Sequence, residues 1–132
     1  MDAQNIVDGL ADYYRDRPDV VAVYLFGSVA RGTSGPRSDV DVGVLYRTAP
    51  QSRLMAQPFR EEANLAEQLK RAVQIIVMNR ASADLVHRVL RDGILVLDQH
   101  PSQRIAFEVR ARNEYFDLLP TLRRYREGRP RA

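Results

Sequence analysis

Hydrophobic and polar positions along the chain follow two periods, which predict strands and helices in alternation. Short apolar runs rich in β-branched residues, bounded by turn signals, predict strands over residues 20–26, 39–45, 73–78 and 94–97. Apolar positions at helical spacing predict helices over residues 3–17, 59–70, 83–92 and from 101 onward. Because the two kinds of element alternate, we expect one α/β (α+β) domain in which helices back a sheet.

Each predicted helix has an apolar side. Asp2 and Ser82 are typical helix caps, and Gly93 suits the position after a helix end. We expect Tyr115 and Phe116 to pack the last helix against the rest of the chain. The apolar positions that share one side are Ile6, Leu10, Tyr13 and Tyr14; Phe59, Ala63, Ala66 and Leu69; Val86, Val89 and Leu90; and Ile105, Val109, Phe116 and Leu119.

The end of the chain differs in charge from the rest. The last twelve residues hold five arginines against one glutamate, a net charge of +4 in a chain whose total is +3. Pro120 is expected to interrupt the long last helix, because it lacks a backbone N–H. We therefore divide the chain into a domain of residues 1–120 and an Arg-rich tail of residues 121–132. The basic charge belongs to the tail, which either steers an acidic partner or is solvated, and no stable nucleic-acid binding is expected.

Composition excludes several classes of protein. The chain of 132 residues suits one domain, and it has no cysteine for a disulfide framework, thiol chemistry or a zinc cluster. Its start, MDAQNIVDGL, lacks the basic and apolar regions of a signal peptide. No apolar run approaches membrane-spanning length. We therefore expect a cytoplasmic protein without membrane contact.

The candidate chemistry lies in residues 26–44, FGSVARGTSGPRSDVDVGV. Gly27 and Ser28 turn the chain after the first strand, and the next three residues leave room for one helical turn. Residues 32–36 then form a polar loop. The turn can offer backbone N–H groups and one hydroxyl to phosphate oxygens.

Two aspartates follow the loop at the spacing of a strand. Asp39 and Asp41 share one face, and Val40, Val42 and Val44 face the core on the other. Two carboxylates this close repel each other unless a cation neutralises them or one keeps its proton. A hard divalent ion with oxygen ligands, above all Mg²⁺, satisfies both.

The order Gly27, Ser28, Asp39, Asp41 resembles the hallmark of the nucleotidyltransferase superfamily, which has the DNA polymerase β-like fold. The fuller form GSVARG…SDVDVGV looks like the small, single-domain minimal nucleotidyltransferase (MNT) branch. Members of that branch are commonly antitoxins paired with HEPN ribonuclease toxins. The resemblance implies a mixed sheet of about four strands, with helices mainly on one side.

The resemblance also implies an activity. The superfamily transfers a nucleoside monophosphate from a triphosphate to an acceptor hydroxyl and releases pyrophosphate, with metal ions bridging the triphosphate. Asp39 and Asp41 then correspond to the catalytic metal ligands, and Gly27 and Ser28 to the phosphate-binding turn. The cofactors implied are Mg²⁺ and ATP.

Three further residues of this stretch, Arg31, Arg37 and Ser38, are polar and lie close to the candidate site in the sequence. Arg31 either contacts phosphate or is a solvated arginine. Ser38 is a candidate nucleotide-binding residue, although its position also suits a residue that ends the loop and orients Asp39. Arg37 is expected to be solvated.

One position departs from the family pattern. The family usually carries a third carboxylate on the next long strand, and the corresponding stretch here is AVQIIVMN, with Gln74 in its place. An amide oxygen is a weak metal ligand and cannot act as the general base for the attacking hydroxyl. Gln74 therefore places catalytic transfer in doubt, and nucleotide binding less so.

Three hypotheses follow. The first is an Mg²⁺-dependent antitoxin that transfers AMP from ATP to a tyrosine of a cognate HEPN toxin. The second is a catalytically weakened relic that neutralises the toxin by binding. The third is an antibiotic nucleotidyltransferase, which the short chain disfavours because such enzymes usually add a second domain to hold the drug.

Overall fold

The computed structural model describes residues 3–35, 38–49 and 58–127. The elements along the chain are α1 (Ala3–Tyr14), β1 (Val20–Phe26), α2 (Gly27–Arg31), β2 (Val40–Tyr46), α3 (Phe59–Leu69), β3 (Val73–Val77), the 3₁₀ turn η1 (Met78–Arg80), α4 (Ala83–Asp92), β4 (Ile94–Asp98) and α5 (Pro101–Arg126). The expectations for Asp2, Arg37 and the tail arginines Arg129 and Arg131 lie outside the described residues.

The four described strands form one mixed sheet in the order β3-β2-β1-β4. β1 pairs antiparallel with both β2 and β4, whereas β2 and β3 run parallel. The mixed sheet of about four strands that the resemblance implied is therefore confirmed. The central strand β1 is buried along almost its whole length, because neighbours cover both its edges and helices cover both its faces.

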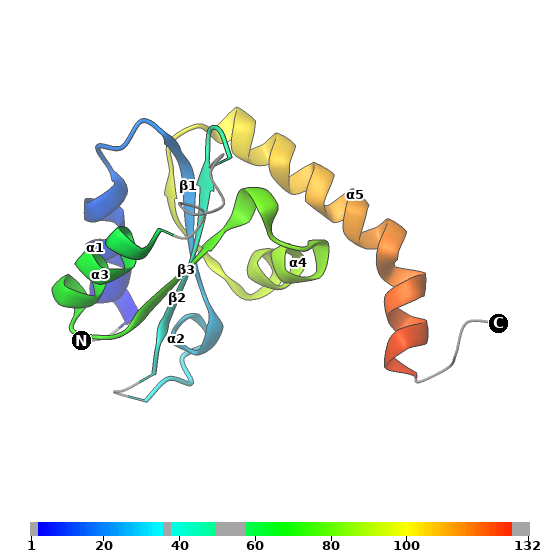
Figure 1. The fold of residues 1–132 in the computed structure, drawn as a ribbon, viewed down its shortest axis with the longest axis horizontal. Helices are drawn as coiled ribbons and strands as arrows, with labels where there is room; N and C mark the ends of the chain where they lie inside the picture. The colour runs from blue at the N-terminus through cyan, green and yellow to red at the C-terminus, as the bar shows by residue number, and fades with distance from the viewer. Residues whose placement is uncertain (1–2, 36–37, 50–57, 128–132) are drawn as a thin grey trace.

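Helices cover both faces of the sheet, so the expectation of helices mainly on one side is wrong. Figure 1 shows α1 and α3 on one side of the sheet and α4 and α5 on the other. The alternating side chains of the strands feed two separate cores. One core joins α1 and α3 to Val40, Val42 and Val44, and the other joins α4 and α5 to Val21 and Tyr24.

The side of α3 that is buried differs from the side that the apolar spacing predicted. Leu65 and Leu69 are buried, but Phe59 is 69% exposed and Ala63 is exposed. The helix is rotated so that the Glu61 and Glu62 carboxylates face inward. Glu61 accepts hydrogen bonds from buried tyrosines, and Glu62 accepts one from the backbone N–H of Ile75 at 2.8 Å. Such buried polar bonds outweigh the burial of one phenyl ring and one methyl group.

Both ends of α4 lie at the residues that were predicted to end it, Ser82 and Gly93. The Ser82 hydroxyl accepts a hydrogen bond from the Leu85 N–H at 3.2 Å and so caps the helix. Gly93 follows the last residue, and its φ is negative. A side chain there would collide with the Val89 carbonyl and press on the Leu25 carbonyl. Glycine is therefore needed at position 93 for the close approach of α4 to β1.

The last helix corrects two expectations. α5 runs through Pro120 to Arg126 and is not interrupted there. Pro120 is exposed, and Figure 1 shows the helix bending along its second half, as a helix with an internal proline does. The predicted apolar positions Ile105, Val109 and Phe116 are exposed, whereas Tyr115 is buried as expected and packs α5 together with Ala111.

Side-chain contacts hold α5 against the sheet and α4. The Tyr24 hydroxyl of β1 donates a hydrogen bond to the buried Glu108 carboxylate at 2.8 Å, and Arg104 pairs with the same carboxylate at 3.0 Å. Further along, the Tyr115 ring stacks on His87 of α4 with a centroid distance of 3.7 Å. Among the described helices, none has both the length and the apolar character that a membrane crossing requires.

Candidate functional site

The strand pairing brings the end of β1 beside the start of β2. Phe26, the last residue of β1, pairs with Asp41 of β2, and α2 begins at the next residue, Gly27. Asp39 lies directly before β2, two positions from Asp41 and on the same face of the strand. This is the face covered by α4 and α5, because the intervening Val40 faces the α1–α3 core. The predicted turn and the two predicted carboxylates therefore lie together.

Gly27 allows the turn to approach the second aspartate. Its φ of 76° lies in the left-handed region that favours glycine. A Cβ added to Gly27 would collide with a carboxylate oxygen of Asp41. Two independent constraints thus require glycine here, and the backbone at the start of α2 lies against the Asp41 carboxylate.

The electrostatics of Asp41 favour a cation at this place. Burial raises the pKa of the Asp41 carboxyl group, the Asp39 carboxylate raises it further, and the Arg31 guanidinium acts in the opposite direction. The protein therefore makes the charged form of Asp41 costly without an added positive charge. Arg31 is exposed but close enough to act on this carboxylate.

Gln74 lies beside Asp41 in the sheet. The parallel pairing of β2 and β3 aligns Asp41 with Gln74 and Val42 with Ile75. Paired residues in neighbouring strands project from the same face, so the Gln74 amide belongs to the carboxylate face. The Gln74 side chain is exposed at this edge of the sheet.

Arg71 holds the loop before Asp39, although it belongs to no motif that marks it in the sequence. The Arg71 guanidinium donates hydrogen bonds to the Ser38 carbonyl at 2.7 Å and the Gly35 carbonyl at 2.9 Å. The Ser38 hydroxyl accepts a hydrogen bond from the Gly35 N–H at 2.8 Å. The Ser38 side chain thus closes the loop, which leads straight into Asp39.

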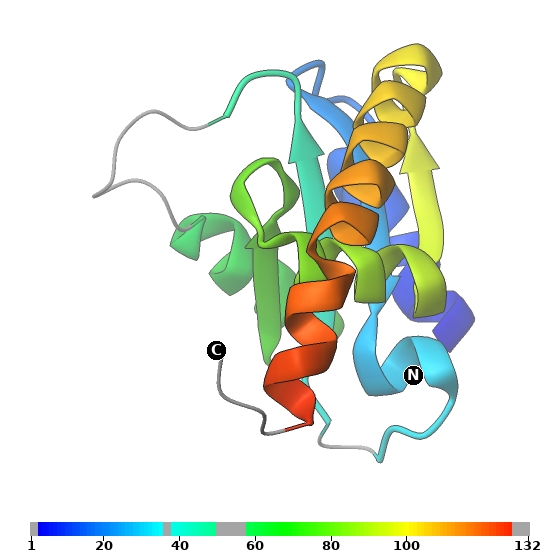
Figure 2. The same cartoon turned by 90° about the vertical axis from the view of Figure 1, so that its right-hand side faces the viewer.

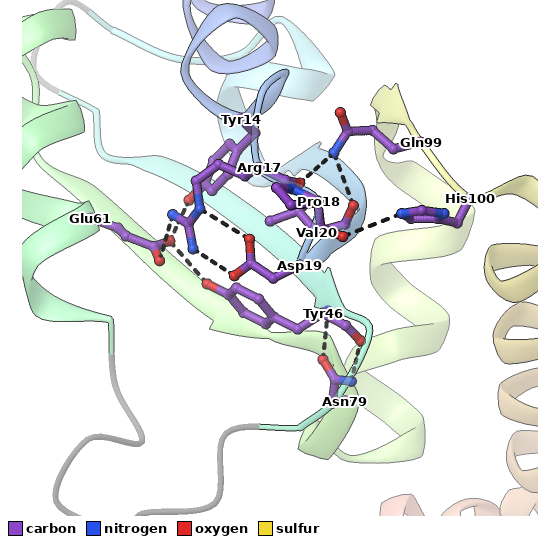
Figure 3. Close-up of polar contacts among 10 residues, drawn as sticks. All are labelled: Tyr14, Arg17, Pro18, Asp19, Val20, Tyr46, Glu61, Asn79, Gln99 and His100. Carbon is purple, nitrogen blue, oxygen red and sulfur yellow. Dashed lines mark hydrogen bonds and ion pairs between the residues drawn. The ribbon is translucent and has the colours of Figure 1, made fainter.

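A second group of polar side chains lies on the other side of the sheet, between α1, α3 and β2 (Figure 3). The Tyr14 and Tyr46 hydroxyls both donate to one oxygen of Glu61 at 2.9 Å, and Arg17 binds the other oxygen at 2.9 Å. Arg17 also pairs with Asp19 at 2.9 Å. We call these five residues the Glu61 cluster.

The Glu61 cluster is built for packing. Burial, and then the Glu61 carboxylate, raise the pKa of the Tyr14 and Tyr46 hydroxyls far above the ordinary value, so both stay protonated donors. The Glu61 side chain is only 16% exposed, and its two oxygens are taken up by three donors. The cluster therefore joins α3 to α1 and β2 and stands apart from the aspartate pair.

Comparison with protein families decides the classification. Residues 8–102 match the family described as Polymerase beta, Nucleotidyltransferase. The chain belongs to this nucleotidyltransferase family. The match spans the Gly27 turn, both aspartates and the strand that carries Gln74. No curated protein matches the chain by sequence.

Solved structures share the nucleotidyltransferase fold of this chain. A toxin–antitoxin complex with AMP-PNP contains a chain with a TM-score of 0.78 and 24% identity, over 92% of this chain and 96% of that one. The complex of a tri-AMPylated Shewanella oneidensis HEPN toxin with MNT antitoxin contains a chain with a TM-score of 0.74 and 21% identity, over 96% of this chain and 97% of that one. The toxin–antitoxin MntA–HepT gives 0.72 at 21% identity, over 95% and 97%. At these identities the likeness establishes the fold.

The donor set of this nucleotidyltransferase suits a hard cation that is completed by a ligand. Asp39 and Asp41 supply carboxylate oxygens, which Mg²⁺ prefers, and the raised pKa of Asp41 is relieved by a positive charge. Among the described residues, no group of three or more His, Cys, Asp or Glu side chains is placed to hold a metal ion. A Mg²⁺ ion on the aspartate pair would therefore need further oxygen ligands from outside this set of side chains.

Proposed function

We propose that this chain is an MNT-type antitoxin that transfers AMP from ATP to a tyrosine of a cognate HEPN ribonuclease toxin. The observation that carries the proposal is the Asp39–Asp41 pair, held on one strand face against the glycine turn at Gly27. Family membership supports nucleotidyl transfer as the reaction class. The similar chains come from toxin–antitoxin complexes, one of which holds an AMPylated HEPN toxin and another AMP-PNP, and this supports the partner and the transferred group.

The reaction joins the tyrosine oxygen to the α-phosphorus of ATP. The bond between that phosphorus and its bridging oxygen breaks, pyrophosphate leaves, and the hydroxyl proton passes to solvent. Mg²⁺, when bound, supplies positive charge beside the triphosphate oxygens. The residues of this chain would position the reactants: Asp39 and Asp41 would hold the metal, the turn at Gly27 and Ser28 would offer N–H groups to phosphate, and Arg31 would add positive charge nearby.

Calorimetry with ATP and MgCl₂ tests the site. The parent protein is expected to bind ATP only when Mg²⁺ is present, and Asp39→Asn/Asp41→Asn to lose that dependence. Asp16→Asn is the matched control, because Asp16 is exposed and lies outside the site. Labelled AMP from ATP should then appear on a cognate HEPN toxin that is mixed with the parent protein. Equal ATP affinity in the parent and the double variant would reject the assignment.

The alignment of Gln74 with Asp41 favours a second candidate function. If position 74 is the third acidic position of the family, this chain lacks a carboxylate to take the acceptor proton. General-base assistance contributes roughly 10²–10⁴-fold in rate, so transfer would be slow while nucleotide binding remains. Such a protein would neutralise the toxin by contact alone.

Gln74→Asp separates the two candidates. An exposed edge position accepts the substitution without disturbing a core, and the new carboxylate would lie beside Asp41. Faster AMP transfer in the variant, with unchanged affinity for the toxin, supports the weakened relic. A parent that already modifies the toxin rapidly, and gains nothing from the substitution, supports the active transferase.

A further inference from the structure

An apolar stripe runs along α5 on a side that the rest of the chain leaves uncovered. Ile105 is 51% exposed, Val109 49% and Phe116 62%. The three positions recur at helical spacing and share one side of the helix, whereas Ala111 and Tyr115 on another side are buried. Large exposed apolar residues that share one side of a helix are candidates for an interaction surface. We call Ile105, Val109 and Phe116 the α5 stripe.

The charges around the α5 stripe are of one sign. At about 3.6 residues per turn, Arg112 falls between Val109 and Phe116, and Arg123 falls beyond them on the same side. Both arginines are exposed, and Arg112 reaches back to Glu108 at 3.6 Å. The exposed carboxylates of this helix, Glu114 and Asp117, project from other sides. A surface that complements the stripe is therefore apolar with a border of carboxylates.

We propose that the α5 stripe is the docking surface for the HEPN toxin, which would present an apolar groove bordered by Asp and Glu side chains. This inference rests on the proposed function for the identity of the partner. A second copy of this chain fits the stripe less well, because its own stripe brings further arginines and no exposed carboxylates of that helix to pair with Arg112 and Arg123.

The position of α5 suits a partner that must also reach the aspartate pair. Figure 2 looks onto the side of the sheet that carries α5, and the helix runs along the height of the molecule there. In both views, the end of α5 and the short helix α2 lie toward the same end of the fold. The aspartate pair opens on this same side of the sheet. A protein docked along the stripe would thus lie on the same side of the sheet as the site that would modify it.

Phe116→Asp tests the docking surface against Phe59→Asp. Both phenylalanines are well exposed, at 62% and 69%, but Phe59 lies in α3 on the opposite side of the sheet. We expect Phe116→Asp to weaken toxin binding by at least about tenfold, as loss of a central aromatic contact does, and Phe59→Asp to leave it unchanged. Isothermal titration of the full-length chain with the HEPN toxin measures both. Arg123→Glu should also weaken binding, and less so at high salt.

Nucleotide binding distinguishes failure of this inference from failure of the proposed function. Parent-like toxin affinity in Phe116→Asp, or equal weakening by both aspartate variants, overturns the stripe while Mg²⁺-dependent ATP binding and transfer still support the function. A parent that neither binds nor modifies the toxin rejects the function and the docking surface together. Sedimentation that shows a parent dimer dispersed by Phe116→Asp assigns the stripe to a second copy and also overturns the inference.

Discussion

At the scale of single residues, the Asp41 carboxylate lowers the stability of the fold, which is consistent with the site proposed here. Burial and the neighbouring Asp39 raise the pKa of Asp41, so the fold holds a carboxylate in a place that disfavours its charge. The close contact with Gly27 leaves that carboxylate little freedom to turn away. An unfavourable charge of this kind is typical of functional sites, which often lower the stability of the protein.

Asp41→Asn should stabilise the metal-free protein at neutral pH. A carboxyl group whose pKa is raised on folding favours the folded state below its unfolded pKa, and this contribution is lost as the pH rises through the folded pKa. Removing the charge should therefore raise the melting temperature by a few degrees at pH 7, with a difference that shrinks toward about pH 4. Melting curves over this pH range measure it, with Asp16→Asn as the control. A variant that melts below the parent at pH 7 would contradict the expectation.

The sequence predicted the aspartate pair but not its supports. Alternation along one strand places Asp39 and Asp41 on one face without knowledge of the fold, and the Gly-Ser turn stands directly before the loop. Arg71 was missed, because its hydrogen bonds go to backbone carbonyls in a loop 33 and 36 residues away. Contacts with the main chain carry no side-chain pattern that a single sequence could reveal.

At the scale of elements, α3 and α5 show where helical periodicity fails. Spacing locates an apolar stripe on a helix, but it does not tell whether the chain itself covers that stripe. In α5 the stripe is real and uncovered, and the buried side holds the charged residue Glu108. In α3 the buried side holds Glu61, whose partners are far away in sequence. Both misses have the same cause: buried carboxylates that long-range hydrogen bonds satisfy.

Glu61→Ala should destabilise the fold strongly. The substitution leaves two buried tyrosine hydroxyls and Arg17 without their common acceptor, and loss of such a charged acceptor costs about 3 kcal/mol in the free energy of unfolding. Glu67→Ala, at an exposed position of the same helix, should change it by less than about 0.5 kcal/mol. Urea denaturation compares the two. Similar losses in both variants would show that the Glu61 cluster contributes little.

At the scale of the whole molecule, the positions of the strands and their joining into one sheet were predicted better than the faces of the sheet that the helices cover. Each strand was located within about two residues, because β-branched runs and turn residues are local signals. The division of helices between two faces depends on which side each crossover takes, and the expectation taken from the resemblance was wrong. Three arginines of the predicted tail, Arg123, Arg124 and Arg126, belong to the last turn of α5 and do not form a separate segment.

Truncation after Thr121 should slow association with the toxin at low salt. The deletion removes five arginines and one glutamate, and with them the ion pair of Arg126 with Asp84 at 3.3 Å. Exposed charge of this kind acts mainly on the association rate and is screened by salt. Stopped-flow measurements at low and high ionic strength should show a difference that disappears at high salt. Equal rates at low salt would leave the tail without a role in steering.

The central place of β1 has a consequence for how the molecule opens. Its amides lie between two strands and two layers of helices, so they can exchange with solvent deuterium only when the whole fold comes apart. The last turn of α5 is exposed at almost every described position, so it can open locally and its amides should exchange much faster. A partner that binds along α5 would then slow exchange in that turn and, because it also holds the native state, in β1. Comparing the two segments by mass spectrometry separates local protection from a gain in global stability.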